Sequence, residues 1–126
     1  MSNLEVIARL TIRPGQLEGF KAQAAEMMRL TRELDTKTVR YDWFIDEDAM
    51  LCEVHEAYTA EEGLFEHSMH IMEPRAVMFE KYASGHRMSF FGPISQQLID
   101  IAHKYADEAH MYLLLQGLEQ PAGAEL

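Results

Sequence analysis

Two side chains suited to proton transfer, Glu56 and His67, lie near the middle of the chain. An imidazole can take a proton near neutral pH, and a carboxylate can orient the ring or act as the base itself. Glu56 ends an apolar strand-like run, where an ionised carboxylate needs a partner. The two residues are therefore candidate catalytic groups. The alternatives are a structural His67 bonded to a strand carboxylate such as Glu56, and a Glu56 that pairs with a lysine or arginine.

Aromatic side chains flank these groups. Tyr41, Trp43 and Tyr58 could stack on an aromatic ligand, and with His70 they are the candidate substrate-binding residues. The alternative for the three aromatic residues is a place in the hydrophobic core.

A metal site is the other chemistry that the histidines allow. His67, His70 and Glu73 have the i, i+3, i+6 spacing that puts them on one side of a helix. This spacing is common by chance, so no metal site is predicted.

A predicted β-hairpin carries most of the candidates. Residues 38–45 and 50–58 read as strands around the acidic turn 46–49. Pairing Ile45 with Met50 puts six side chains on one face, because side chains alternate along a strand: Val39, Tyr41, Trp43, Cys52, Val54 and Glu56. A one-residue slip in this register would exchange the faces.

Each remaining element shows either the periodicity of a strand or that of a helix. Residues 4–12 read as a strand that ends at Arg13-Pro14-Gly15, and residues 16–34 as an amphipathic helix. A second helix over 59–72 opens with the capping-box pair Thr59 and Glu62, and Pro74 interrupts it. The segment that follows ends at residues 83–85.

The last third of the chain predicts a strand over 86–91 and a helix from residue 96 to about 104, capped by Ser95. Residues 110–115 fit a strand or a continued helix. A strand is preferred because Asp107 breaks the helical pattern and Gly117 follows.

This order predicts an α+β, ferredoxin-like βαββαβ fold with an extra C-terminal helix and a possible fifth strand. Residues 1–118 are expected to form one domain and residues 119–126 a loose tail. Helices on one sheet face leave the other open, and a second copy could cover it, which predicts a homodimer.

Composition limits the function. The 126 residues are 48% apolar, and the formal charge of −10 without a basic cluster argues against nucleic acid and anionic membranes as partners. No apolar run is long enough to cross a bilayer, and the N-terminus lacks a secretory signal. With a single cysteine, Cys52, this predicts a cytoplasmic protein.

Several stretches together resemble the antibiotic biosynthesis monooxygenase family, dimeric α+β barrel proteins that include quinol monooxygenases. The resemblance covers residues 4–118 and rests on the order and spacing of five features. They are the strand running into Arg13-Pro14-Gly15 and its long helix, Arg40-Tyr41-Asp42-Trp43, Glu56-Ala57-Tyr58 with His67 nine residues after the aromatic, Phe91-Gly92-Pro93-Ile94-Ser95, and Gly117-Leu118.

The resemblance implies a cofactor-independent oxygenase. Such enzymes use molecular oxygen to oxidise electron-rich phenols or quinols in an apolar pocket between sheet and helices, with no metal, flavin or haem. It assigns the proton acceptor to His67, since the family commonly has a histidine there.

Two alternatives to this reading are a haem protein and a non-catalytic protein. Haem-degrading relatives have an asparagine and a tryptophan where this chain has Ala8 and Tyr58, which argues against haem. A non-catalytic, ligand-binding or stress-related dimeric protein remains the rival, because fold alone does not fix function.

Overall fold

The computed structural model describes residues 3–119, and the part of the expected tail from residue 120 onward lies outside them. The elements follow in the order β1 (Leu4–Ile12), α1 (Leu17–Leu34), β2 (Thr38–Asp46), β3 (Leu51–Tyr58), α2 (Glu61–His70), α3 (Met72–Val77), the π-helical turn η1 (Met78–Tyr82), β4 (Ala83–Phe91), α4 (Gln96–Tyr105) and β5 (Glu108–Tyr112).

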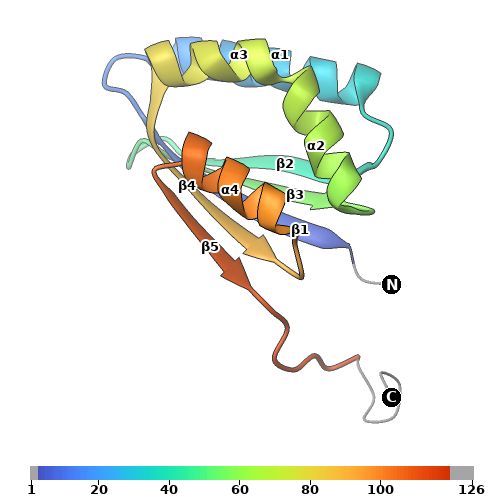
Figure 1. Ribbon diagram of the computed structural model, residues 1–126. Helices are drawn as coiled ribbons and strands as arrows, with labels where there is room; N and C mark the ends of the chain where they lie inside the picture. The colour runs from blue at the N-terminus through green and yellow to red at the C-terminus, as the bar shows by residue number, and fades with distance from the viewer. Residues whose placement is uncertain (1–2, 120–126) are drawn as a thin grey trace.

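The strands form one sheet in the order β2-β3-β1-β4-β5, in which only β5 runs parallel to its neighbour. The first four strands have the ferredoxin-like arrangement, and α4 connects β4 to the added edge strand β5. Helices α1, α2 and α3 cover one face of the sheet, and α4 lies on the same side near β4 and β5 (Figure 1). The α+β, ferredoxin-like prediction is confirmed, including the fifth strand.

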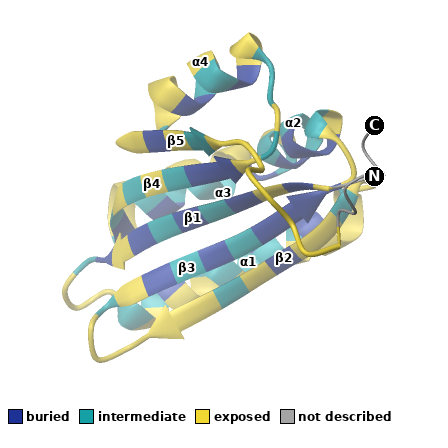
Figure 2. Ribbon diagram, turned by 90° about the horizontal axis from the view of Figure 1, so that it is seen from below, coloured by how far each residue is buried: buried dark blue, intermediate teal, exposed yellow. Residues whose placement is uncertain are grey.

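The core lies between the sheet and the helices, as the alternation in β1 predicted. Leu4, Val6, Ala8, Leu10 and Ile12 are all buried, with exposed fractions of at most 7%. The opposite sheet face carries no helix in the described part of the chain (Figure 2). Within residues 3–119, no helix is both long and apolar enough to cross a bilayer.

The hairpin register differs from the expected one by two residues. Ile45 pairs with Cys52, and Tyr41 pairs with Glu56. The shift arises because β2 continues to Asp46, whose carboxylate accepts from the Ala49 N–H at 3.1 Å in the turn. A shift of two keeps every side chain on its predicted face, since the strand period is two.

Val39 is the exception on this face. A β-bulge between Thr38 and Arg40 interrupts the alternation, and Val39 is 54% exposed where a core position was expected. The prediction for Val39 is therefore wrong.

The predicted Thr59 cap is also wrong. Ala60 occupies the N-cap of α2 and no side chain caps it, whereas Glu61 and Glu62 lie in the first turn. The Thr59 N–H instead donates to the Lys37 carbonyl at 3.0 Å, which fixes this residue to the start of β2. The predicted Ser95 cap is confirmed, because its hydroxyl accepts from the Leu98 N–H at 3.2 Å.

Other helix and strand boundaries differ from the predicted ones by a few residues. Pro74 lies in the first turn of a separate helix, α3, where a proline needs no N–H partner. Residues 83–85 already belong to β4 and do not end a helix. The fifth strand begins at Glu108 and ends at Tyr112, so Leu113, Leu114 and Leu115 are exposed.

Candidate functional site

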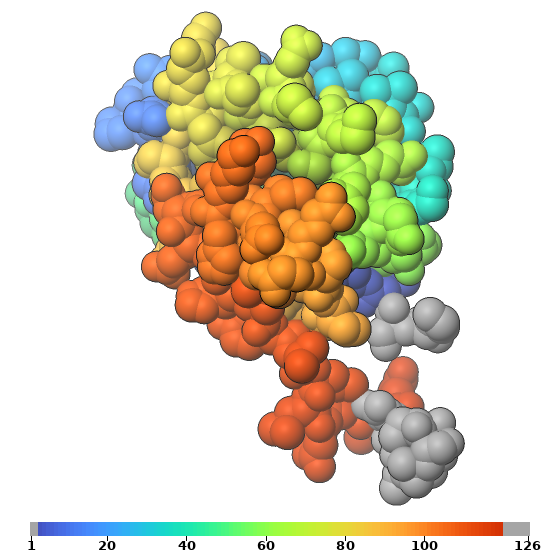
Figure 3. Space-filling model, in the orientation of Figure 1, coloured from blue at the N-terminus to red at the C-terminus, as the bar shows by residue number. Residues whose placement is uncertain are grey.

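A cavity of about 510 Å³ lies between β3 and β4 on one side and α2, α3 and α4 on the other. Its wall is mainly apolar, with a few polar groups that include Glu56, His67, Ser68 and Arg75. In the space-filling view, α4 (orange) lies against α2 and α3 (green to yellow) over this region (Figure 3). A volume of this size accommodates a small organic ligand.

His67 reaches the cavity from the buried side of α2, and its side chain is 3% exposed. Its Nδ1 lies 2.8 Å from Oδ2 of Asp35. The Tyr41 ring packs edge-on against the imidazole at a centroid distance of 4.5 Å. The ring is thus held in one orientation from two sides.

Asp35 follows the last turn of α1, where its backbone N–H donates to the Thr31 carbonyl at 3.0 Å. This bond fixes the carboxylate beneath α2. Its other oxygen, Oδ1, lies 2.6 Å from Nδ1 of His70, and the Thr38 hydroxyl donates to Oδ2. Burial acts to raise the pKa of Asp35, but the hydrogen bonds from His67, His70 and Thr38 outweigh it and lower the pKa to about 2.

An ionised Asp35 decides which His67 nitrogen carries the proton. Because the carboxylate can only accept, Nδ1–H must donate to it. The lone pair of a neutral His67 then lies on Nε2, and no hydrogen bond to Nε2 occurs within residues 3–119. This arrangement suits a general base.

Glu56 lies on the helix-facing side of β3, and only 7% of it is exposed. The Tyr58 hydroxyl, two residues along the same strand, donates to its Oε1 at 2.5 Å. Burial raises the pKa of Glu56, although the charges of His67 and Arg75 and the Tyr58 hydrogen bond partly oppose it. Glu56 is thus a buried carboxyl group whose pKa lies above its ordinary value.

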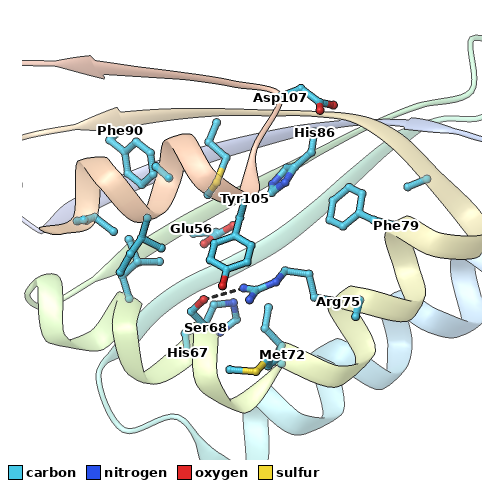
Figure 4. A pocket seen from close by; sticks show the side chains of 18 of the residues that line it. Glu56, His67, Ser68, Met72, Arg75, Phe79, His86, Phe90, Tyr105 and Asp107 are labelled. Atoms are coloured by element: carbon cyan, nitrogen blue, oxygen red, sulfur yellow. Dashed lines mark hydrogen bonds between the residues drawn. The ribbon is translucent and has the colours of Figure 1, made fainter.

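Arg75 projects from α3 into the cavity. Its Nη1 donates to the Ser68 hydroxyl at 2.7 Å, and its guanidinium carbon lies 6.0 Å from the Tyr105 ring centroid. Figure 4 shows this guanidinium beside Ser68 and Tyr105. Burial lowers the pKa of Arg75, and nearby acidic groups, Glu56 first, act in the opposite direction.

His86 closes the far end of the cavity, stacked on Phe79 with ring centroids 4.5 Å apart. Burial lowers the pKa of His86 to about 4, so its imidazole is neutral at pH 7. It therefore adds a polar but uncharged wall.

The structure brings the two predicted catalytic residues, His67 and Glu56, to the same cavity. The four predicted substrate-binding residues, Tyr41, Trp43, Tyr58 and His70, do not line it. Tyr41 and Trp43 pack in the core under α1, and Tyr58 belongs to a second core cluster. His70 bonds to Asp35 from the next turn of α2.

Two residues of the site, Asp35 and Arg75, were not predicted from the sequence. Asp35 orients His67, which was one of the roles considered for Glu56. Asp35 is 32 residues from His67, and no local spacing connects the two. Arg75 follows Pro74, which was interpreted as a helix break and is the first-turn residue of α3.

The possible metal face of His67, His70 and Glu73 is not formed. Both imidazoles use Nδ1 to bond to Asp35. In the described part of the chain, no group of three or more histidine, cysteine, aspartate or glutamate side chains is arranged to hold a metal ion.

The chain was compared with known proteins. No family model and no curated protein matches it. Among solved structures, MupZ from Pseudomonas fluorescens is similar with a TM-score of 0.76 and 21% identity over 96% of this chain and 97% of that one. Rv0793 from Mycobacterium tuberculosis has a TM-score of 0.64 and 25% identity over 75% of this chain and 98% of that one.

A third similar structure is described as an antibiotic biosynthesis monooxygenase. Its TM-score is 0.63, with 18% identity over 73% of this chain and 99% of that one. At such identities the likeness establishes the shared fold. The resemblance to the antibiotic biosynthesis monooxygenases is confirmed at that level.

Proposed function

We propose, from the fold that this chain shares with the antibiotic biosynthesis monooxygenases, that it is a cofactor-independent monooxygenase acting on a quinol or polycyclic phenol. The observation that carries the proposal is the hydrogen-bonded pair of Asp35 and His67 at the wall of an apolar cavity. Such a pair supplies a base where a small aromatic molecule has room to bind.

His67 starts the reaction by accepting the substrate hydroxyl proton at Nε2. Asp35 stabilises the imidazolium that forms, because its carboxylate already accepts from Nδ1. The proton transfer leaves an electron-rich phenolate in an apolar environment that excludes water.

The phenolate then reduces molecular oxygen directly. For a quinol, one ring C–H becomes C–O and the two hydroxyls become carbonyls, so one quinol and one O₂ yield one hydroxyquinone and one water. All electrons come from the substrate, which is why the reaction needs no external reductant.

Glu56 supplies a second proton-transfer group. Its raised pKa follows from burial, and its Oε1 is held by Tyr58. A protonated Glu56 can donate to the oxygen atom that leaves as water.

Oxygen consumption with a panel of quinols and polycyclic phenols tests this function. The proposal expects oxygen uptake and hydroxyquinone formation in a one-to-one ratio, in protein stripped of metals by chelation. The alternative function is a non-catalytic ligand-binding protein, which the apolar cavity also suits. Tight binding without oxygen uptake would favour that alternative.

The proposal includes a homodimer formed through the open sheet face in the cytoplasm. That face carries exposed apolar side chains, including Phe44, Leu51, Phe91 and Tyr112 at 38–49% exposure, which a second copy would bury. Light scattering at micromolar concentration tests the dimer, and a stable monomer would contradict it.

A further inference from the structure

Two arginines line the cavity, and they differ in what their guanidinium groups contact. Arg13 donates to the carbonyl oxygens of Phe79 at 2.7 Å and Ala83 at 3.0 Å. These bonds tie the residue after β1 to η1 and to the first residue of β4. Arg13 therefore uses two of its five N–H donors to hold the fold together.

Arg75 has most of its donors unused. A guanidinium has five N–H donors, and the one described bond of Arg75 is to Ser68. Within residues 3–119, no carboxylate forms an ion pair with it. A partly buried cation without a directly paired counter-charge is costly.

Glu56 lines the same cavity and its charge acts on Arg75 from a distance, but no hydrogen bond or ion pair joins the two side chains within residues 3–119. Its carboxyl instead accepts from the Tyr58 hydroxyl. The chain has 21 acidic residues and a formal charge of −10, yet none of the described acidic side chains pairs with Arg75. An anion paired directly with Arg75 would therefore come from a ligand in the cavity.

We propose that Arg75 binds a carboxylate group on an otherwise apolar aromatic ligand. The guanidinium is a planar fork that matches a carboxylate in a two-bond geometry. A phosphate dianion would need further donors, and Arg13, the other arginine in the wall, is held by its two bonds to backbone carbonyls. The ring system of the ligand would lie against the apolar wall that includes Phe79, Met88 and Phe90.

This inference rests on the proposed function only in naming its substrate class, an aromatic acid with a phenolic hydroxyl. It can be tested apart from catalysis, by measuring binding without oxygen. The probes are 6-hydroxy-2-naphthoic acid and its amide, 6-hydroxy-2-naphthamide, which have the same rings and hydroxyl but differ in charge.

Isothermal titration under nitrogen with the full chain measures both affinities. The acid is expected to bind the unaltered protein about 10- to 100-fold more tightly than the amide, the usual worth of a charged hydrogen-bonded contact. In Arg75→Met this preference should disappear while amide binding changes little. In Arg75→Lys, which keeps the charge but loses the fork, the preference should be intermediate.

Arg32→Met is the matched control, because Arg32 is an exposed α1 residue that does not line the cavity. It should keep the full preference for the acid. If Arg75→Met fails to fold, the acid-to-amide ratios of the unaltered protein and of Arg75→Lys decide.

Four results would overturn the inference. They are equal affinity of acid and amide for the unaltered protein, no binding of either, an acid preference that survives in Arg75→Met, and an acid preference that is undiminished in Arg75→Lys. None depends on turnover. A failure of the oxygenase proposal would appear as absent oxygen uptake instead, so the two failures are distinguishable.

Discussion

Nδ1 of His67 lies 2.8 Å from Oδ2 of Asp35, and the side chains of these two residues are 3% and 2% exposed. The pair joins α2 to the segment after α1. It therefore links the packing of two helices to the chemistry of the cavity.

Replacing Asp35 with asparagine should impair turnover without leaving a cavity beside His67. The amide keeps the size of the carboxylate, but it cannot stabilise an imidazolium and can hold either His67 tautomer. We expect a loss in kcat of roughly 10²- to 10⁴-fold, by analogy with the orienting carboxylate of serine proteases. Steady-state oxygen uptake by folded Asp35→Asn measures it, and an unchanged kcat would remove Asp35 from the mechanism.

The same carboxylate should make stability depend on acid pH. The folded-state pKa of Asp35 falls from 3.8 to about 2, so its stabilising contribution is complete above about pH 4 and is lost as the pH falls toward 2. The free energy of unfolding of the unaltered protein should therefore drop more steeply than that of Asp35→Asn in this window. Urea titrations at pH 2, 3, 4 and 5 measure the difference. An equal pH dependence of the unfolding free energy in the two proteins would contradict the lowered pKa of Asp35.

Glu56 should change the pH dependence of stability in the opposite direction to Asp35. Burial raises its folded-state pKa, so the ionised form is destabilising at high pH. Glu56→Gln keeps an acceptor for the Tyr58 hydroxyl and should have a melting temperature equal to or above that of the unaltered protein at pH 8, with a smaller advantage at pH 5. If Glu56 donates a proton in turnover, the variant should also consume oxygen more slowly. A lower melting temperature at both pH values would indicate a structural ion pair instead.

Gly63 sets how closely α2 approaches the sheet. A Cβ at this position would lie 2.9 Å from the Lys37 Cβ and 3.1 Å from the Lys37 carbonyl oxygen. Gly63→Ala should therefore destabilise the fold by about 1–3 kcal/mol, more than the roughly 1 kcal/mol that alanine adds to helix propensity. Met69→Ala, an exposed change on the same helix, is the control. Equal urea midpoints for both variants would show that the helix can move aside.

The sequence was most informative where a pattern repeats over many residues. The alternation in β1 and the hydroxyl of Ser95 identified a strand and a helix start, because each reflects local chemistry. The prediction failed at Val39 because a bulge inserts a residue and breaks the alternation. The two-residue register shift left the side chains on their predicted faces, since it equals one strand period.

The candidate site was predictable in part. His67 and Glu56 were found as side chains able to transfer protons, and both line the cavity. Asp35 could not be assigned to His67, because their proximity arises from the packing of α2 on the end of α1. The aromatic residues Tyr41 and Trp43 were on the correct sheet face, yet α1 covers that part of it.

Oxygen uptake by folded His67→Ala is the most direct test of the central claim, that His67 accepts the substrate proton. We expect turnover to fall by roughly 10²- to 10⁴-fold, the usual contribution of a positioned base. His70→Ala, one turn along α2 and also bonded to Asp35, should lose much less. Melting temperatures measured on the same samples separate lost chemistry from lost folding. Full activity in a folded His67→Ala variant would contradict the account.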